Sequence, residues 1–267
     1  MRTLFTLLIC LNAALAQYGN TEADEKPVFQ WPNGVKCAVS LTFDDARLSQ
    51  IDKGIPLLNQ YNIKATFYIT PHNMDQRLDG WRQAVQEGHE IGNHTVSHPC
   101  TGNYPFSLDN ALEDYTKETI AGELDAANRY ILENLGVRAV SFAYPCGQKF
   151  YGRGEQVMSY VPLVAERFLT GRGWLDEDSN DPWVCDMAQL MGMESDGKSF
   201  DELKALVDKA ARSGRWLILA GHEMRESGSQ TTYLSSLESL CRYASDPANG
   251  IWIDTVEHVA EYILNNR

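Results

Sequence analysis

The chain has 267 residues, 43% of them hydrophobic, which suits one large folded domain with a substantial core. Its formal net charge of −13, without basic clusters, argues against nucleic acid as a partner because phosphate backbones would be repelled. The charge also disfavours strongly anionic polysaccharides, so among glycans neutral sugars fit best.

The N-terminus has the features of a secretory signal. Arg2 precedes an apolar run over residues 4–15, and Ala14 and Ala16 form a small-x-small cleavage site. This run is too short to remain as a membrane span, and no later run is long and apolar enough to be one. We therefore expect a secreted or periplasmic protein with three parts: a signal peptide over residues 1–16, an N-terminal tail over 17–34 and one domain over 35–267.

Beyond the tail, apolar runs of strand length alternate with stretches of helical periodicity. Strands are predicted at residues 37–43, 65–70, 90–93, 139–144, 168–170, 187–191, 216–220 and 251–254. Helices are predicted at residues 51–61, 81–87, 108–135, 200–213, 232–243 and 255–264. This alternation indicates parallel strands joined by crossover helices, and seven or eight repeats indicate a barrel. Residues 151–182 show the least regularity, and we expect them to form loops over one barrel end.

Carboxylate and imidazole side chains follow three of the predicted strands. Asp44 and Asp45 follow the first strand, His94 and His98 follow the third, and His222 follows the seventh. The carboxyl ends of parallel strands share one rim of a barrel, where active sites of this architecture lie. We expect these five side chains to face a common pocket.

Two imidazoles and one carboxylate form a ligand set that holds a zinc-like ion and leaves a coordination position open for water. A second carboxylate beside that position is what a hydrolase needs as a general base. Each motif also has a structural interpretation, since Asp44 and Asp45 are suited to cap the next segment and His222 to make a local hydrogen bond. Their occurrence together on one rim favours the metal site.

These motifs resemble those of the polysaccharide deacetylases of carbohydrate esterase family 4, the NodB homology domain. Residues 42–45 (Thr-Phe-Asp-Asp) resemble the first family motif, and residues 88–98, which end in His-Thr-Val-Ser-His, resemble the second. Residues 217–222 resemble the last motif, and residues 251–263 resemble the closing strand and helix. The resemblance extends from Val35 to the end of the chain and implies an α/β fold, a distorted (β/α) barrel with seven or eight strands.

By this resemblance, Asp45, His94 and His98 are ligands of one divalent metal ion, Asp44 is the general base and His222 is the general acid. The ligand types favour zinc, and cobalt or nickel also suit them. General chemistry supports the division of roles. A bound metal lowers the pKa of water, a carboxylate beside a cation stays ionised and accepts a proton, and a histidine titrating near neutrality donates one to the leaving group.

The third family motif is altered in this chain. Residues 142–147 read Phe-Ala-Tyr-Pro-Cys-Gly, so Ala143 replaces the arginine that orients the base carboxylate in the family, and Cys146 replaces an aromatic residue. Arg167 and Arg172 are candidates to supply the missing cation. The backbone N–H of Cys146 is still suited to bind substrate at the oxyanion position, because that role does not depend on the side chain.

The fourth motif, an aspartate and a tryptophan near the acid histidine, has several candidates. Its tryptophan is Trp174 or Trp183, and its aspartate is Asp176, Asp181 or Asp186. Both tryptophans are also candidates to stack on a sugar ring as substrate-binding residues, with core packing as the alternative.

Five cysteines remain after the predicted signal peptide, so at least one is unpaired in an oxidising compartment. Cys100 and Cys146 each follow a proline in a predicted rim loop. We predict a disulfide between them beside the pocket, which requires a Cα separation of no more than about 7 Å.

The leading hypothesis is an exported, metal-dependent hydrolase that removes N- or O-linked acetyl groups from a neutral glycan of the chitin, peptidoglycan or xylan type. A competing hypothesis, motivated by Ala143 and Cys146, keeps the fold as a carbohydrate-binding protein with weak or lost catalysis. A third is hydrolysis of amides that are not on sugars. The complete set of five motif side chains argues for the first, because a pure binding protein does not need a spare base.

Overall fold

The structure, a computed structural model, describes residues 28–267. The expected signal peptide and most of the expected tail lie outside the described residues. Phe29 and Trp31, at the end of that expected tail, are each only 4% exposed and pack in a hydrophobic cluster. Within residues 28–267, no helix combines the length and hydropathy that crossing a bilayer would require.

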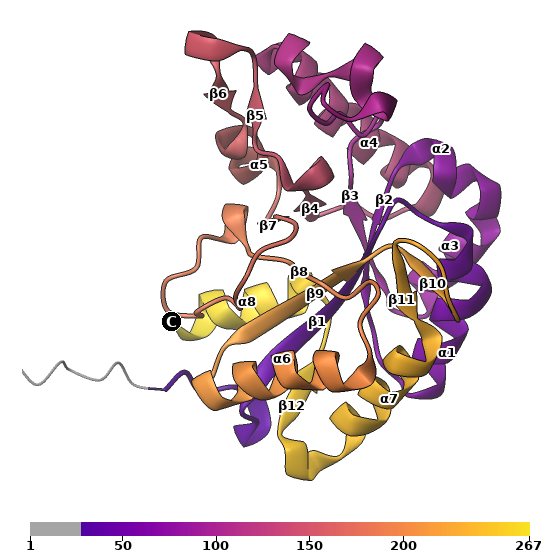
Figure 1. The fold of residues 1–267 in the computed structure, drawn as a ribbon, viewed down its shortest axis with the longest axis vertical. Helices are drawn as coiled ribbons and strands as arrows, with labels where there is room; N and C mark the ends of the chain where they lie inside the picture. Colours follow the sequence, from indigo (N-terminus) through magenta and orange to yellow (C-terminus); the bar gives the residue numbers. More distant parts are fainter. Residues whose placement is uncertain (1–27) are drawn as a thin grey trace, which may run out of the picture.

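Eight parallel strands form one curled sheet at the centre of the molecule (Figure 1). Seven of them follow the order β7-β4-β3-β2-β1-β9-β8, and β12 pairs with the start of β1. The strands are β1 (Cys37–Asp44), β2 (Thr66–Ile69), β3 (Glu90–Asn93), β4 (Ser141–Ala143), β7 (Thr170–Arg172), β8 (Met193–Glu194), β9 (Trp216–Gly221) and β12 (Ile251–Ile253). A bridge between Arg172 and Leu190 connects β7 to the chain just before β8. The expected distorted α/β barrel is confirmed as a curled half-barrel.

Helices surround this sheet (Figure 1). They are α1 (Ile55–Gln60), α2 (Pro71–Met74), α3 (Leu78–Gln86), α4 (Lys117–Leu135), α5 (Val161–Arg167), α6 (Phe200–Ser213), α7 (Leu234–Ser245) and α8 (Val256–Asn266). Two further pairs of short strands stand apart from the main sheet: β5 (Phe150–Tyr151) with β6 (Met158–Ser159), and β10 (Glu223–Arg225) with β11 (Thr231–Tyr233).

Alternation along β1 explains how the sheet is packed. Val39, Leu41 and Phe43 belong to the largest hydrophobic cluster, which also contains side chains of α1, α3, α6 and α7. Ala38 points to the other face and joins the cluster that contains α8. Successive strand residues face opposite sides, so both faces of this central strand are covered by apolar groups. Asp44 ends the strand at its carboxyl end, where the hydrophobic clusters give way to polar side chains.

Three predicted elements differ from the structure. The helix expected over 108–135 begins only at Lys117, where Thr116 caps it by accepting a hydrogen bond from the Thr119 N–H. The preceding residues form two 3₁₀ turns, because the Leu112 N–H donates to the Cys100 carbonyl and ties that segment to the rim loop.

The strand expected at 187–191 is a 3₁₀ turn over Met187–Gln189, and the true strand, β8, begins at Met193. The apolar run there packs against α8 instead of extending the sheet. The strand expected at 168–170 lies two residues later, as β7. Residues 151–182 are also more regular than expected, since they contain β6, α5 and β7.

Candidate metal and acid-base site

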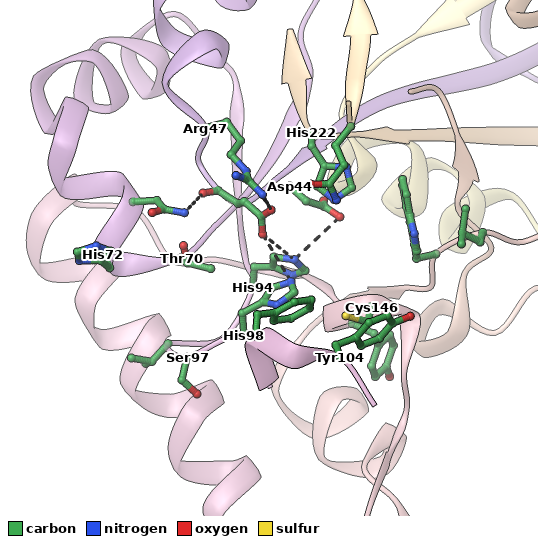
Figure 2. Close-up of a pocket in the computed structure, with 18 residues that line it drawn as sticks. Asp44, Arg47, Thr70, His72, His94, Ser97, His98, Tyr104, Cys146 and His222 are labelled. Atoms are coloured by element: carbon green, nitrogen blue, oxygen red, sulfur yellow. Dashed lines mark hydrogen bonds and ion pairs between the residues drawn. The ribbon is translucent and has the colours of Figure 1, made fainter. Parts of the chain in front are cut away.

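The structure brings the predicted side chains together at the carboxyl end of the sheet. One cavity of about 510 Å³ lies there (Figure 2). The predicted site residues that line it are Asp44, Asp45, His94, His98, Cys146, Trp174 and His222. Each comes from the loop or strand end that follows β1, β3, β4, β7 or β9, as parallel strand ends require.

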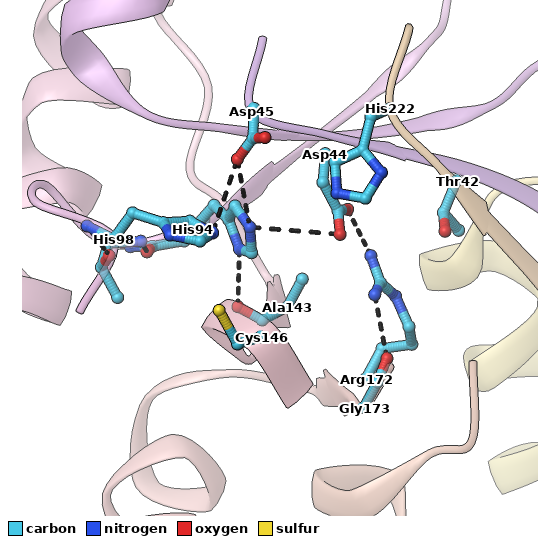
Figure 3. A network of polar contacts seen from close by, with 12 residues as sticks. Thr42, Asp44, Asp45, His94, His98, Ala143, Cys146, Arg172, Gly173 and His222 are labelled. Carbon is cyan, nitrogen blue, oxygen red and sulfur yellow. Dashed lines mark hydrogen bonds and ion pairs between the residues drawn. The ribbon is translucent and has the colours of Figure 1, made fainter. Parts of the chain in front are cut away.

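Asp45, His94 and His98 present their ligand atoms to one point (Figure 3). Asp45 Oδ1 lies 3.6 Å from His94 Nε2 and 3.5 Å from His98 Nε2, and one ligand atom from each residue lies within 4.8 Å of the others. The second oxygen of Asp45, Oδ2, accepts a 2.8 Å hydrogen bond from Arg47, which leaves Oδ1 for the imidazoles.

Protonation states make this cluster suited to a cation. His94 Nδ1 lies 2.8 Å from the Ala143 carbonyl, which can only accept, so Nδ1 is the donating nitrogen and Nε2 is the nitrogen left to offer a lone pair to a cation. Burial, reinforced by the neighbouring His94, lowers the pKa of His98 to about 4. Burial alone would raise the pKa of Asp45, but His94, His98 and Arg47 lower it to about 2. The two Nε2 lone pairs and the negatively charged Asp45 carboxylate thus face one another, and a divalent ion fits this donor set.

Side chains behind the second motif hold the loop that carries both histidines. The Asn93 side chain accepts from the Thr95 N–H at 2.8 Å. Glu123, on α4, accepts from the N–H groups of Val96 and Ser97 at 2.8 and 2.9 Å. The turn that carries His94 and His98 is therefore held by Asn93 at the end of β3 and by Glu123 on α4.

Strained backbone is concentrated at this cavity. Within residues 28–267, nine non-glycine residues have positive φ, and five of them line the cavity: Asp45, His98, Cys146, Leu175 and Gln230. Such conformations are costly for L-residues and persist only where surrounding contacts impose them, which is common at functional sites.

Asp44 contacts a buried guanidinium. Arg172 Nη2 donates to Asp44 Oδ1, while Arg172 Nη1 donates to the Gly173 carbonyl at 2.9 Å (Figure 3). Arg172 is 0% exposed, and its guanidinium carbon lies 4.9 Å from the centre of the Tyr68 ring. Asp44 is 3% exposed, so this ion pair is shielded from water and holds the carboxylate in one orientation.

Of the two arginines considered as replacements for the one missing at position 143, Arg172 is the one that reaches Asp44. Ala143 on β4 and Arg172 on β7 are paired neighbours in the sheet, so the cation comes from the adjacent strand at the same level. Gly192 provides the space, because a Cβ there would lie 2.4 Å from Arg172 Cδ. Arg167 instead pairs with Asp125 at the surface.

His222 is held by Asp196, which the sequence analysis missed. His222 Nδ1 lies 2.7 Å from Asp196 Oδ2, and the His222 N–H donates to Asp196 Oδ1 at 3.2 Å. Burial lowers the pKa of His222, but the Asp196 hydrogen bond and the carboxylates of Asp44 and Asp45 outweigh it and raise that pKa above its usual value. Because Nδ1 is occupied, Nε2 is the nitrogen that remains for a ligand.

The approach of Asp196 depends on Gly221. A Cβ at Gly221 would lie 2.8 Å from Asp196 Oδ1 and 2.2 Å from the hydroxyl oxygen of Thr232, which donates to the same carboxylate. The Gly-His pair at the end of β9 is therefore required by packing as well as by chemistry.

The prediction that Asp176, Asp181 or Asp186 is the aspartate that holds the acid histidine is wrong. Asp176 accepts from the Gly192 N–H, Asp181 from the Trp183 N–H, and Asp186 caps the 3₁₀ turn that follows it. Trp174 does contact the acid histidine, with ring centres 4.9 Å apart in an edge-to-face arrangement. Trp183 packs near Phe29, with ring centres 5.2 Å apart, in a hydrophobic cluster.

Cys100 and Cys146 form the predicted disulfide, with Cα atoms 6.0 Å apart. It links the loop that carries His98 to the loop that follows β4. His98 and both sulfurs lie close enough to resemble a second metal cluster, but disulfide sulfurs are not thiolate ligands. In the described part of the chain, Cys37, Cys185 and Cys241 are unpaired.

Gln50 is a further residue that the sequence analysis missed. Its amide group is buried and donates to the carbonyls of Asp44 and His222, at 2.7 and 2.9 Å. It therefore fixes the ends of β1 and β9 relative to each other. A residue six positions after Asp44, inside the next helical turn, carries no sequence signal for this role.

A family model described as polysaccharide deacetylase matches residues 32–159. The peptidoglycan-N-acetylglucosamine deacetylase of Bacillus cereus is 43% identical to this chain over 65 residues, which are 24% of either protein. The chain spans between 5% and 27% of the length of the first three curated relatives that it matches.

Solved structures share the fold over most of the chain. A protein from Mycobacterium smegmatis has a TM-score of 0.66 and 17% identity, covering 88% of this chain and 92% of that one. A family 4 acetyl xylan esterase from Clostridium thermocellum, in complex with a cobalt ion, has a TM-score of 0.55 and 18% identity, covering 84% and 91%.

Proposed function

Because the chain belongs to the polysaccharide deacetylase family, we propose that it is a metal-dependent hydrolase that removes N- or O-linked acetyl groups from a neutral glycan. The observation that carries the proposal is the convergence of the two His Nε2 atoms on Asp45 Oδ1, at 3.6 and 3.5 Å, beside the separate Asp44–Arg172 pair. A ligand cluster with an adjacent, independently held carboxylate is suited to hydrolysis.

Asp45, His94 and His98 would hold one divalent ion, for which zinc is the best match to the ligand types, with cobalt or nickel as alternatives. When bound, such an ion lowers the pKa of water and polarises the acetyl carbonyl. Asp44 would accept the proton of the attacking water, and Arg172 would keep its carboxylate oriented for that transfer.

His222 would donate a proton to the departing amine or alcohol, and Asp196 would keep its ring in the required tautomer and orientation. The backbone N–H of Cys146 would contact the developing oxyanion, and Trp174 would bind the sugar next to His222. The disulfide also supports the proposed export, because disulfides persist mainly in oxidising compartments.

The test is acetate release from chitooligosaccharides, peptidoglycan fragments and acetylated xylan by purified protein of known metal content. We expect release from at least one of these glycans, loss of it after chelation and recovery when the ion is added back. Binding of a glycan without release, by metal-loaded protein, would favour the carbohydrate-binding alternative. Release only from acetylated amides that are not sugars would favour the third hypothesis.

Replacing Asp196 with asparagine is expected to move the alkaline limb of the kcat/KM profile to lower pH. The carboxylate raises the pKa of His222, so without it the imidazolium, the form able to donate a proton, disappears at a lower pH. The measurement is a pH–rate profile of both proteins loaded with the same metal.

Asp254→Asn is the matched control, because Asp254 contacts His258 Nδ1 at 3.0 Å on the surface, away from the cavity. We expect that variant to keep the wild-type profile. An Asp196→Asn protein whose alkaline limb stays in place would show that His222 is not the general acid.

A further inference from the structure

Two aromatic rings are left exposed at the rim of the cavity, beside the candidate metal ligands. Tyr104 is 43% exposed and Phe106 is 68% exposed, and both line the cavity. Figure 2 labels Tyr104 at the edge of the ligand cluster. Their rings stack on each other with centres 5.3 Å apart and planes 13° apart. The Phe106 ring also lies 6.3 Å from the ring of His98, so this aromatic surface is continuous with the site.

The loop that carries these rings is held in place by contacts that do not involve them. Cys100 is bonded to Cys146, and the Ser107 hydroxyl accepts from the Cys100 N–H at 3.0 Å and donates to its carbonyl at 2.9 Å. Glu113 accepts from the N–H of Gly102 at 3.0 Å. The rings therefore face water on a pre-organised segment, which lowers the ordering cost of binding a ligand there.

The chemistry of this surface selects a sugar ring. Single exposed apolar side chains are ordinary, but two rings stacked on each other beside a polar cavity each keep one face that the partner ring does not cover, and such a face is flat, apolar and electron-rich. The C–H groups on one face of a pyranose complement such a surface. Nucleobases also stack on aromatic rings, but the phosphates that accompany them are disfavoured by the net charge of −13.

We propose that Tyr104 and Phe106 form a subsite that binds a neutral pyranose ring next to the sugar whose acetyl group is removed. The inference rests on the proposed function and narrows it, because a subsite outside the metal cluster is useful only for a substrate of two or more linked sugars. The enzyme should then prefer oligosaccharides to monosaccharides.

The test compares tetra-N-acetylchitotetraose and acetylated xylotetraose with the corresponding acetylated monosaccharides. The preference for the tetrasaccharide in kcat/KM should fall about three- to tenfold in Phe106→Ala and further in the Tyr104→Ala/Phe106→Ala double variant, by analogy with the strength of aromatic stacking. The loss should lie mainly in KM, and Phe106→Tyr should retain the preference.

Leu108→Ala is the matched control. Leu108 is 64% exposed on the same loop but does not line the cavity, so its loss should leave the preference unchanged. A preference that is equal in the wild type and the double variant would overturn the subsite while leaving the proposed deacetylase intact.

If metal-loaded wild-type protein releases no acetate from any glycan, the proposed function fails, and calorimetric titration with tetra-N-acetylchitotetraose still decides the subsite. Weaker binding by the double variant than by Leu108→Ala would support it. Equal binding by the two variants, or no binding by the wild type, would overturn it.

Discussion

Asparagine in place of Asp44 is expected to lower kcat by about 10²–10⁴-fold while the protein keeps its metal ion. The amide cannot accept a proton from the attacking water, whereas Asp45, His94 and His98 remain able to hold the ion. The measurement is acetate release at saturating glycan, with metal content determined on the same preparation and melting temperature as a check of the fold.

Asp45→Asn is the variant to compare with Asp44→Asn. The Asp45 carboxylate belongs to the ligand cluster, whereas the Asp44 carboxylate pairs with Arg172. That variant should lose metal and activity together, whereas Asp44→Asn should lose activity alone. Acetate release at the wild-type rate by Asp44→Asn would refute Asp44 as the base.

Removing the guanidinium of Arg172 should have the second large effect, on both stability and activity. Arg172→Ala leaves the Asp44 carboxylate buried at 3% exposure without its cation, and breaking a buried ion pair in this way costs about 3–5 kcal/mol. A loss of this size lowers the melting temperature by on the order of 10 °C in a domain of this length. kcat should fall as well, because the carboxylate loses its orientation.

Returning the arginine to the neighbouring strand gives the sharpest test. Since Ala143 and Arg172 are paired across β4 and β7, the double variant Ala143→Arg/Arg172→Ala should recover part of the lost kcat. Arg167→Ala is the control, because its partner Asp125 is half exposed and such surface pairs contribute about 0–1 kcal/mol. Unchanged kcat and stability in Arg172→Ala would contradict the role assigned to this residue.

Residues placed directly at strand ends were predictable from the chain. Asp44, Asp45 and His222 lie at the ends of long apolar runs, and His94 and His98 follow the short strand predicted over 90–93, so the rule that parallel strand ends share a rim was enough to group them. The disulfide was predictable in the same way, because both cysteines lie in loops on that rim.

Arg172 and Asp196 follow the same rule, but their strands are short and were expected in the wrong place. β7 and β8 contain three and two residues, and each lies just after a more apolar segment that packs elsewhere. Asp196 stands two residues beyond β8, as His222 stands one beyond β9. Correct bounds for these two strands would have pointed to Asp196.

The order of residues along the chain by itself determined the α/β class and the five side chains of the candidate site, because strand periodicity and strand ends are local properties. Only the tertiary structure decided which cation faces Asp44, which carboxylate holds His222 and which rings border the cavity. The Asp44–Arg172 contact joins segments that lie more than a hundred residues apart in the chain. It also requires the burial of a charged side chain, Arg172, which no local hydropathy pattern predicts.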